Sequence, residues 1–155
     1  MSSDPPGFEL PLRLLFAFRG LIDDLHAELA KQGHPFVRPM HGFVFQAIGT
    51  DGSTAAELGR QLGISKQAAG KMVDGLELLG YVYRERDPHD GRRMLVRLTH
   101  HGVDCLAKSA RIFDRLRSKW AKTLGTQRLQ QLEEDLRTLT SSTVMRLDVP
   151  GWFAP

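Results

Sequence analysis

The sequence has little of what several classes of protein require. Its 155 residues include one cysteine, Cys105, so no internal disulfide framework can form and a reducing compartment is expected. No apolar run approaches the ~18 to 20 residues of a membrane-spanning helix, so we expect no membrane association. The N-terminal stretch MSSDPPGFEL carries acids and lacks the basic and apolar regions of a signal peptide. These absences predict a cytoplasmic protein.

Catalytic and metal-binding patterns are also missing. The chain has no nucleophile elbow, P-loop, dinucleotide fingerprint or HExxH motif. Its six histidines show no paired spacing typical of metal ligands, and no cysteine accompanies them. We therefore expect no metal, no cofactor and no enzymatic activity. Cys105 is expected to be a small buried apolar residue.

The charge is small in total but uneven along the chain. The net charge is +3, while residues 60–97 hold eight Lys/Arg against five Asp/Glu. A basic excess in one segment favours an acidic partner, most commonly nucleic acid.

Apolar spacing and capping residues predict a series of helices. The spacing predicts an amphipathic helix over residues ~9–32 and a shorter one from Arg38 to Ile48. Thr54 begins a third helix through a capping box with Glu57. Ser65 caps a fourth helix, which is expected to end near residue 80. Two short helices joined by a tight glycine-containing turn indicate a helix-turn-helix.

A hairpin and two further helices are predicted to follow. YVYRER and RMLVRLT alternate as strands do, and the turn formers DPHDG separate them. Thr99 and Thr126 are predicted to cap the next two helices. Apolar residues recur in both at steps of three and four, namely Val103, Leu106, Ala110, Phe113, Trp120 and Leu124, then Leu129, Leu132, Leu136 and Leu139. These stripes exceed what one small domain needs, and they indicate a partner surface.

The polar side of the fourth helix suits DNA. Lys66, Gln67, Gly70 and Lys71 lie opposite its apolar stripe, behind the Ser65 cap. Lys and Gln can donate to base edges in the major groove, and a small residue permits close approach. The alternative is an ordinary solvated helix face.

The hairpin carries an unusual concentration of arginine. Pro88 and Gly91 set a turn that is flanked by Arg84, Arg86, Arg92 and Arg93, so we expect the guanidinium groups to project from a rigid tip. Arginine is favoured in narrow minor grooves. The acids Asp87 and Asp90 are expected to hold the neighbouring arginines by charge-assisted hydrogen bonds.

Residues 54–102, TAAELGRQLGISKQAAGKMVDGLELLGYVYRERDPHDGRRMLVRLTHHG, resemble the MarR family of bacterial transcriptional regulators. The resemblance rests on the helix-turn-helix, a wing of the type DPxDxR and an LTxxG helix start. The wing-tip aspartate and arginine of the family map onto Asp90 and Arg92. Gly91 stands where many members carry an arginine, and Arg93 replaces a common small residue.

This resemblance implies a mainly α fold with a small β-hairpin wing (α+β) over a single chain, residues 1–155. It implies a winged helix-turn-helix lobe at residues 38–99. Dimerisation helices are implied at residues 8–33 and 100–147.

The function implied is that of a homodimeric, ligand-responsive repressor that binds a pseudo-palindromic double-stranded DNA operator. The expected DNA-binding residues are Ser65, Lys66, Gln67, Gly70, Lys71, Arg84, Arg86, Asp90, Arg92 and Arg93. A small aromatic effector would bind near Phe16, Arg19, His41 and Phe45. Two alternatives stay open: a winged-helix module used for protein contacts, and a small enzyme.

Overall fold

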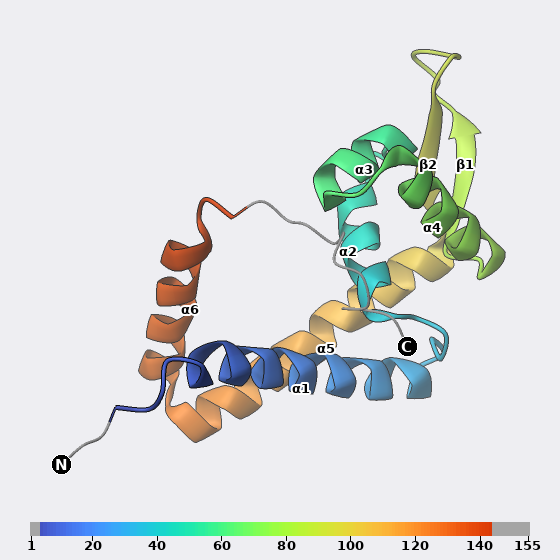
Figure 1. Cartoon of the computed structure of the whole chain (residues 1–155). Coiled ribbons are helices and arrows are strands. Elements are labelled where there is room, and N and C mark those ends of the chain that lie inside the picture. The colour runs from blue at the N-terminus through green and yellow to red at the C-terminus, as the bar shows by residue number, and fades with distance from the viewer. Residues whose placement is uncertain (1–3, 144–155) are drawn as a thin grey trace.

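The computed structural model describes residues 4–143, which form helices and one β-hairpin (Figure 1). In chain order the elements are α1 (Glu9–Lys31), α2 (Pro39–Ile48), α3 (Ala55–Leu62), α4 (Lys66–Leu78), β1 (Val82–Arg86), β2 (Met94–Leu98), α5 (His100–Leu124) and α6 (Thr126–Thr140). The predicted mainly α fold with a hairpin wing is confirmed. Residues 144–147 of the segment assigned to dimerisation lie outside the described residues.

Local capping positions the helix-turn-helix. The Glu57 backbone N–H donates to Thr54 Oγ1 at 3.1 Å, and the Thr54 backbone N–H donates to Glu57 Oε2 at 2.9 Å, which completes the predicted capping box. Gly63 ends α3 with φ +67°, a left-handed conformation that favours glycine. Ser65 then accepts the Ala68 N–H at 3.0 Å and starts α4. The turn between α3 and α4 is therefore set by the residues that the sequence singles out.

The hairpin is antiparallel, and a third segment pairs with the middle of β2. Val82 pairs with Leu98 at the base, and Arg86 pairs with Met94 near the tip. Ser53, just before α3, forms an isolated bridge with Val96, with N···O distances of 3.1 and 2.8 Å. This bridge joins β2 directly to the start of the helix-turn-helix.

The start of α5 explains the LTxxG pattern. Thr99 Oγ1 accepts the Gly102 N–H at 3.1 Å and donates to the Gly80 carbonyl at 2.6 Å. A Cβ on Gly102 would collide with the carbonyl oxygen of Tyr81. The motif therefore caps α5 and lets it pack closely on the entry to β1.

The predicted cap of α6 is wrong. Gly125 occupies the N-cap position, and Thr126 is the first residue inside the helix, with no side-chain capping bond. Gly125 has φ +89°, so the chain turns one residue earlier than the capping preference of threonine indicates.

One apolar core joins the helix-turn-helix, the hairpin and the long helices. Its buried members include Leu25, Leu29, Val44, Phe45, Ile48, Leu58, Leu62, Val73, Leu76, Val82, Val96, Cys105, Ile112 and Leu116. The expectation that Cys105 is a buried apolar residue is confirmed, and burial raises the pKa of its thiol to about 11.

The face of α5 that packs into this core is not the face that carries its most regular apolar spacing. Cys105, Ile112 and Leu116 are buried, whereas Val103 is 53% exposed and Phe113 is 36% exposed. The helix has two apolar faces, and periodicity alone does not say which one the chain covers itself.

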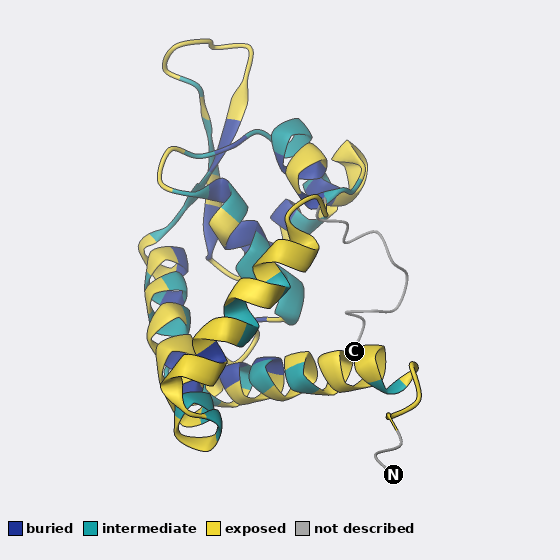
Figure 2. Cartoon of the chain, turned by 90° about the vertical axis from the view of Figure 1, so that its left-hand side faces the viewer, coloured by how far each residue is buried: buried dark blue, intermediate teal, exposed yellow. Residues whose placement is uncertain are grey.

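The long helices extend well beyond the helix-turn-helix. Helix α5 lies along α1 and leads from the winged lobe to α6 at the far end (Figure 1). Much of the surface of these helices is exposed, as Figure 2 shows. Among the described residues, no helix is long and apolar enough to cross a membrane.

Candidate nucleic-acid interface

Helix α4 presents a polar side to solvent. Its opposite side is buried through Ala69, Val73 and Leu76. Lys66, Gln67 and Lys71 are exposed near its N-terminal half, and open space surrounds the position of a Cβ on Gly70. Ser65 Oγ accepts the Ala68 N–H as the helix cap, which leaves its hydroxyl proton available to donate. The buried stripe thus fixes which polar side chains α4 offers.

Arg84 lies against α4 and not at the wing tip. Its guanidinium donates to Asp74 at 2.8 Å, to Glu77, and to the Gly70 carbonyl at 3.4 Å. Its side chain is only 27% exposed. The expected projection of Arg84 toward DNA is therefore not seen, because two carboxylates on α4 hold it.

Two further wing arginines bond within the lobe. Arg97 pairs with Glu85 across the hairpin and donates to the Asp51 carbonyl at 3.0 Å. Arg86 donates to the Gly91 carbonyl at 3.0 Å, inside the tip.

Arg93 is paired with α3. Its Nη2 donates to Glu57 Oε1 at 2.6 Å, and its Nε lies 3.9 Å from Asp87 Oδ2. The pKa of Glu57 is lowered, first because the carboxylate accepts the Thr54 backbone N–H and also because Arg93 lies beside it.

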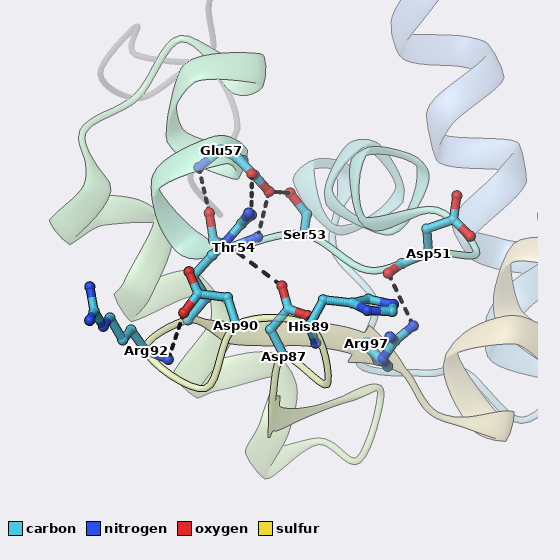
Figure 3. Close-up of polar contacts among 10 residues, drawn as sticks. Asp51, Ser53, Thr54, Glu57, Asp87, His89, Asp90, Arg92 and Arg97 are labelled. Atoms are coloured by element: carbon cyan, nitrogen blue, oxygen red, sulfur yellow. Dashed lines mark hydrogen bonds and ion pairs between the residues drawn. The ribbon is translucent and has the colours of Figure 1, made fainter.

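Arg92 differs from its neighbour. Its backbone N–H donates to Asp90 Oδ1 at 3.1 Å, and its side chain makes no hydrogen bond or ion pair within residues 4–143. In Figure 3 the Arg92 guanidinium lies apart from Glu57 and Asp87. Asp90 holds the tip through this backbone bond and not through a guanidinium, because the short aspartate side chain closes a local turn instead.

A cleft separates the wing from the start of the helix-turn-helix. It encloses about 470 Å³ and is lined by Thr54, Ala55, Ala56, Glu57, Arg60, Lys66, Arg92, Arg93 and Met94. Three of its cations, on Arg60, Lys66 and Arg92, have no described carboxylate partner within residues 4–143. The cleft is therefore basic and open, and it suits a phosphate group.

The predicted effector residues fall into two separate pairs. Phe16 is 55% exposed on α1, and Arg19 lies 3.7 Å from Asp23 on the same helix. His41 and Phe45 lie on α2 with ring centroids 6.4 Å apart. No hydrogen bond, ion pair or ring contact of the described chain joins one pair to the other.

The α2 pair is largely enclosed. Phe45 is 1% exposed, and burial, together with Arg38 and His26, lowers the pKa of His41 to about 4. The four expected effector residues therefore lie in two places, Phe16 and Arg19 on α1 and His41 and Phe45 on α2.

A buried polar network escaped the sequence analysis. His34 Nδ1 lies 2.9 Å from the Tyr81 hydroxyl, and its Nε2 lies 2.8 Å from Asp104 Oδ2. Burial raises the pKa of Tyr81 to about 12. These residues are separated by 47 and 70 positions, so no local pattern could have paired them. Residues 4–143 contain no group of three His, Cys, Asp or Glu suited to a metal ion.

This arrangement defines a winged helix-turn-helix protein with long helices on both sides of the winged lobe. Residues 37–93 match the model of the MarR family. This match covers most of the winged helix-turn-helix segment and confirms the resemblance seen in that part of the sequence. The match favours a regulator over the alternative of a small enzyme.

A curated relative supports the assignment. The uncharacterized HTH-type transcriptional regulator YcgE of Bacillus subtilis (strain 168) is 34% identical over 96 residues, which are 62% of this chain. The chain spans 58% of the length of that relative.

Solved structures share the fold over most of the chain. The Streptococcus pneumoniae FabT complex with DNA aligns with a TM-score of 0.75 at 15% identity, over 88% of this chain and 96% of FabT. Apo MarR from E. coli aligns with a TM-score of 0.65 at 22% identity, over 88% of this chain and 98% of MarR. These likenesses show the fold.

Proposed function

We propose that the protein is a sequence-specific, double-stranded DNA-binding transcriptional regulator. The observation that carries the proposal is the exposed polar side of α4 beside a basic cleft whose outer edge bears the unpaired side chain of Arg92. A helix of this kind enters the major groove while a wing reaches the adjacent minor groove or backbone. The FabT relative is in complex with DNA, which supports the same role here.

We assign the proposed DNA contacts to side chains that make no hydrogen bond or ion pair within residues 4–143. Lys66, Gln67 and Lys71 are proposed to contact base edges or phosphates, with Gly70 permitting close approach. Arg92 is proposed to enter the minor groove, and Arg60 to contact a phosphate. Arg86 and Asp90 are proposed to hold the shape of the wing tip. Arg84 is proposed to stabilise α4 through its ion pairs with Asp74 and Glu77.

A homodimer fits the long helices. Large apolar side chains on α1, α5 and α6 are exposed in the single chain, including Leu14 at 45% and Leu139 at 77%. A hollow of about 320 Å³ between these helices is lined by Leu21, Phe113, Asp114, Arg117, Trp120, Leu129, Leu132, Glu133 and Leu136. We propose that residues 8–33 and 100–147 cover this apolar surface in a dimer, with residues 38–99 as the DNA-binding lobe.

The regulatory part of the proposal is a cytoplasmic repressor that a small aromatic effector releases from a pseudo-palindromic operator. Its mechanism would be a change in the separation of the two α4 helices, which requires the effector to favour one dimer state. The His41 and Phe45 pair is the proposed starting point for effector mutagenesis, since its rings already lie together.

Selection of duplexes from a random-sequence pool by the purified protein tests the proposal. A dimeric regulator enriches an inverted repeat with half-sites about one helical turn, ~34–36 Å, apart. Enrichment of no sequence over the input pool would contradict it and would favour a winged-helix module used for protein contacts.

A further inference from the structure

The Glu57 carboxylate makes hydrogen bonds in two places, at the start of α3 and in the wing. Its Oε2 accepts the Thr54 N–H at 2.9 Å and the Ser53 hydroxyl at 3.3 Å, at the start of α3. Its other oxygen, Oε1, accepts Arg93 Nη2 at 2.6 Å, from the wing. One carboxylate therefore links the first helix of the helix-turn-helix to the hairpin (Figure 3).

The position of Arg93 in the wing is fixed from both sides. Its carbonyl accepts the Asp87 N–H at 2.9 Å, and its own N–H donates to the Asp90 carbonyl at 3.0 Å. The Asp87 side chain, 11% exposed, lies 3.9 Å from Arg93 Nε. The guanidinium thus lies between a carboxylate of α3 and a carboxylate of the wing.

The positive charge of Arg93 is therefore compensated locally by the carboxylates of Glu57 and Asp87. A cation already paired with carboxylates attracts a phosphate less than a free one, and breaking the pair to reach DNA would leave Glu57 facing the phosphates. Arg92, one residue earlier, has no such partner in the described chain, and its guanidinium lies apart from both carboxylates.

The wing needs support at this place. A two-stranded hairpin is marginally stable by itself, and here the bridge from Ser53 to Val96 reaches only the middle of β2. The pair between Glu57 and Arg93 lies farther out, between Met94 and the tip, and spans one wall of the basic cleft. It can therefore set how far the Arg92 side chain stands from α4.

We infer that Arg93 is a positioning residue, which holds the wing against α3 through Glu57, and is not a DNA contact. This inference deepens the proposed DNA-binding function and rests on it for its consequence in binding. The orientation of the wing, by contrast, is a property of the free protein.

The first test uses the free, full-length protein. Glu57→Gln retains an acceptor for the Thr54 N–H, since glutamine also serves in a capping box, but it removes the charge that faces Arg93. Arg93→Ala removes the other partner. Backbone ¹⁵N relaxation of residues 88–92 should show a rigid tip in the wild type and increased mobility in both variants. An unchanged order parameter in both variants would overturn the inference.

The second test measures binding to a duplex that the wild-type protein selects from a random pool. Both variants should weaken binding by a similar factor, up to about fivefold for an exposed ion pair. The double variant should be no weaker than either single variant, because both remove the same contact. The salt dependence of binding should stay that of the wild type.

The opposite pattern identifies Arg93 as a DNA contact. Arg93→Ala would then reduce the slope of log affinity against log salt by about one, whereas Glu57→Gln would leave binding unchanged or strengthen it. That result would overturn the inference and leave the proposed function intact. If the wild type selects no duplex, the proposed function fails, and the relaxation experiment still decides the role of Arg93.

Discussion

At the scale of single residues, some cations of the candidate interface are paired with a carboxylate and others are not. Arg84, Arg93 and Arg97 each lie against a carboxylate of the same lobe. Lys66 and Arg92 have no such partner within the described residues, and both line the basic cleft. The number of arginines in the wing therefore overstates the charge available to DNA.

Gly70 allows a test of how closely α4 approaches DNA. No atom lies within 4 Å of a Cβ built at Gly70 or at Gly75, and both residues are inside α4. Replacing either glycine by alanine should stabilise the fold by ~0.5–1 kcal/mol, because alanine loses less backbone entropy in a helix. Thermal unfolding measures this gain.

Only Gly70→Ala should weaken binding to the selected duplex, by about tenfold, or ~1.4 kcal/mol, as the added methyl separates α4 from the groove. Gly75→Ala is the matched control, since it makes the same change in the half of α4 that is not proposed to contact bases. Equal affinities for the two variants would show that Gly70 does not lie against DNA.

At the scale of elements, the two halves of the continuous helix α1 differ in burial. Its C-terminal half is buried through Ile22, Leu25 and Leu29, whereas Leu14 and Leu15 in its N-terminal half are 45% and 46% exposed. Exposed apolar residues in a continuous helical stripe indicate a missing partner. The dimer proposed above supplies one.

Leu14→Glu tests that partner surface. We expect the wild type to sediment at about twice the chain mass of 17.4 kDa, and the variant to shift toward the monomer, because a buried unpaired carboxylate is costly. Leu78→Glu is the control, since Leu78 is 90% exposed on α4 and away from the proposed dimer surface. Sedimentation that is identical for wild type and Leu14→Glu would count against the assigned role of α1.

Elements that depend on local chemistry could be predicted from the sequence, and those that depend on distant partners could not. The caps at Thr54, Ser65 and Thr99 follow from hydrogen bonds three residues along the chain. The contact between Glu57 and Arg93 spans 36 residues. The sequence already assigns Glu57 to a helix cap and Arg93 to the wing, so neither residue indicates the other as its partner. The sequence therefore located the wing and its arginines without showing which arginine stays free.

Across the whole molecule, the winged lobe and the long helices form one packed unit. The buried His34 reaches Tyr81 at the entry to β1 and Asp104 on α5, and Lys108 of α5 donates to the Gln32 carbonyl at 2.9 Å after α1. A change in the packing of α1 against α5 would move the wing entry with it. This connection is the physical basis for the proposed control of α4 separation by an effector.

The most direct measurement of the central claim is the affinity for the selected duplex as a function of salt concentration. Log affinity should fall linearly with log salt, with a slope of about −0.9 for each phosphate contact. Arg92→Ala should reduce the magnitude of the slope by about one. Arg128→Ala, which removes an exposed arginine of α6 at the far end of α5, should leave it unchanged. Binding that is independent of salt, or a slope that Arg92→Ala does not alter, would contradict the account.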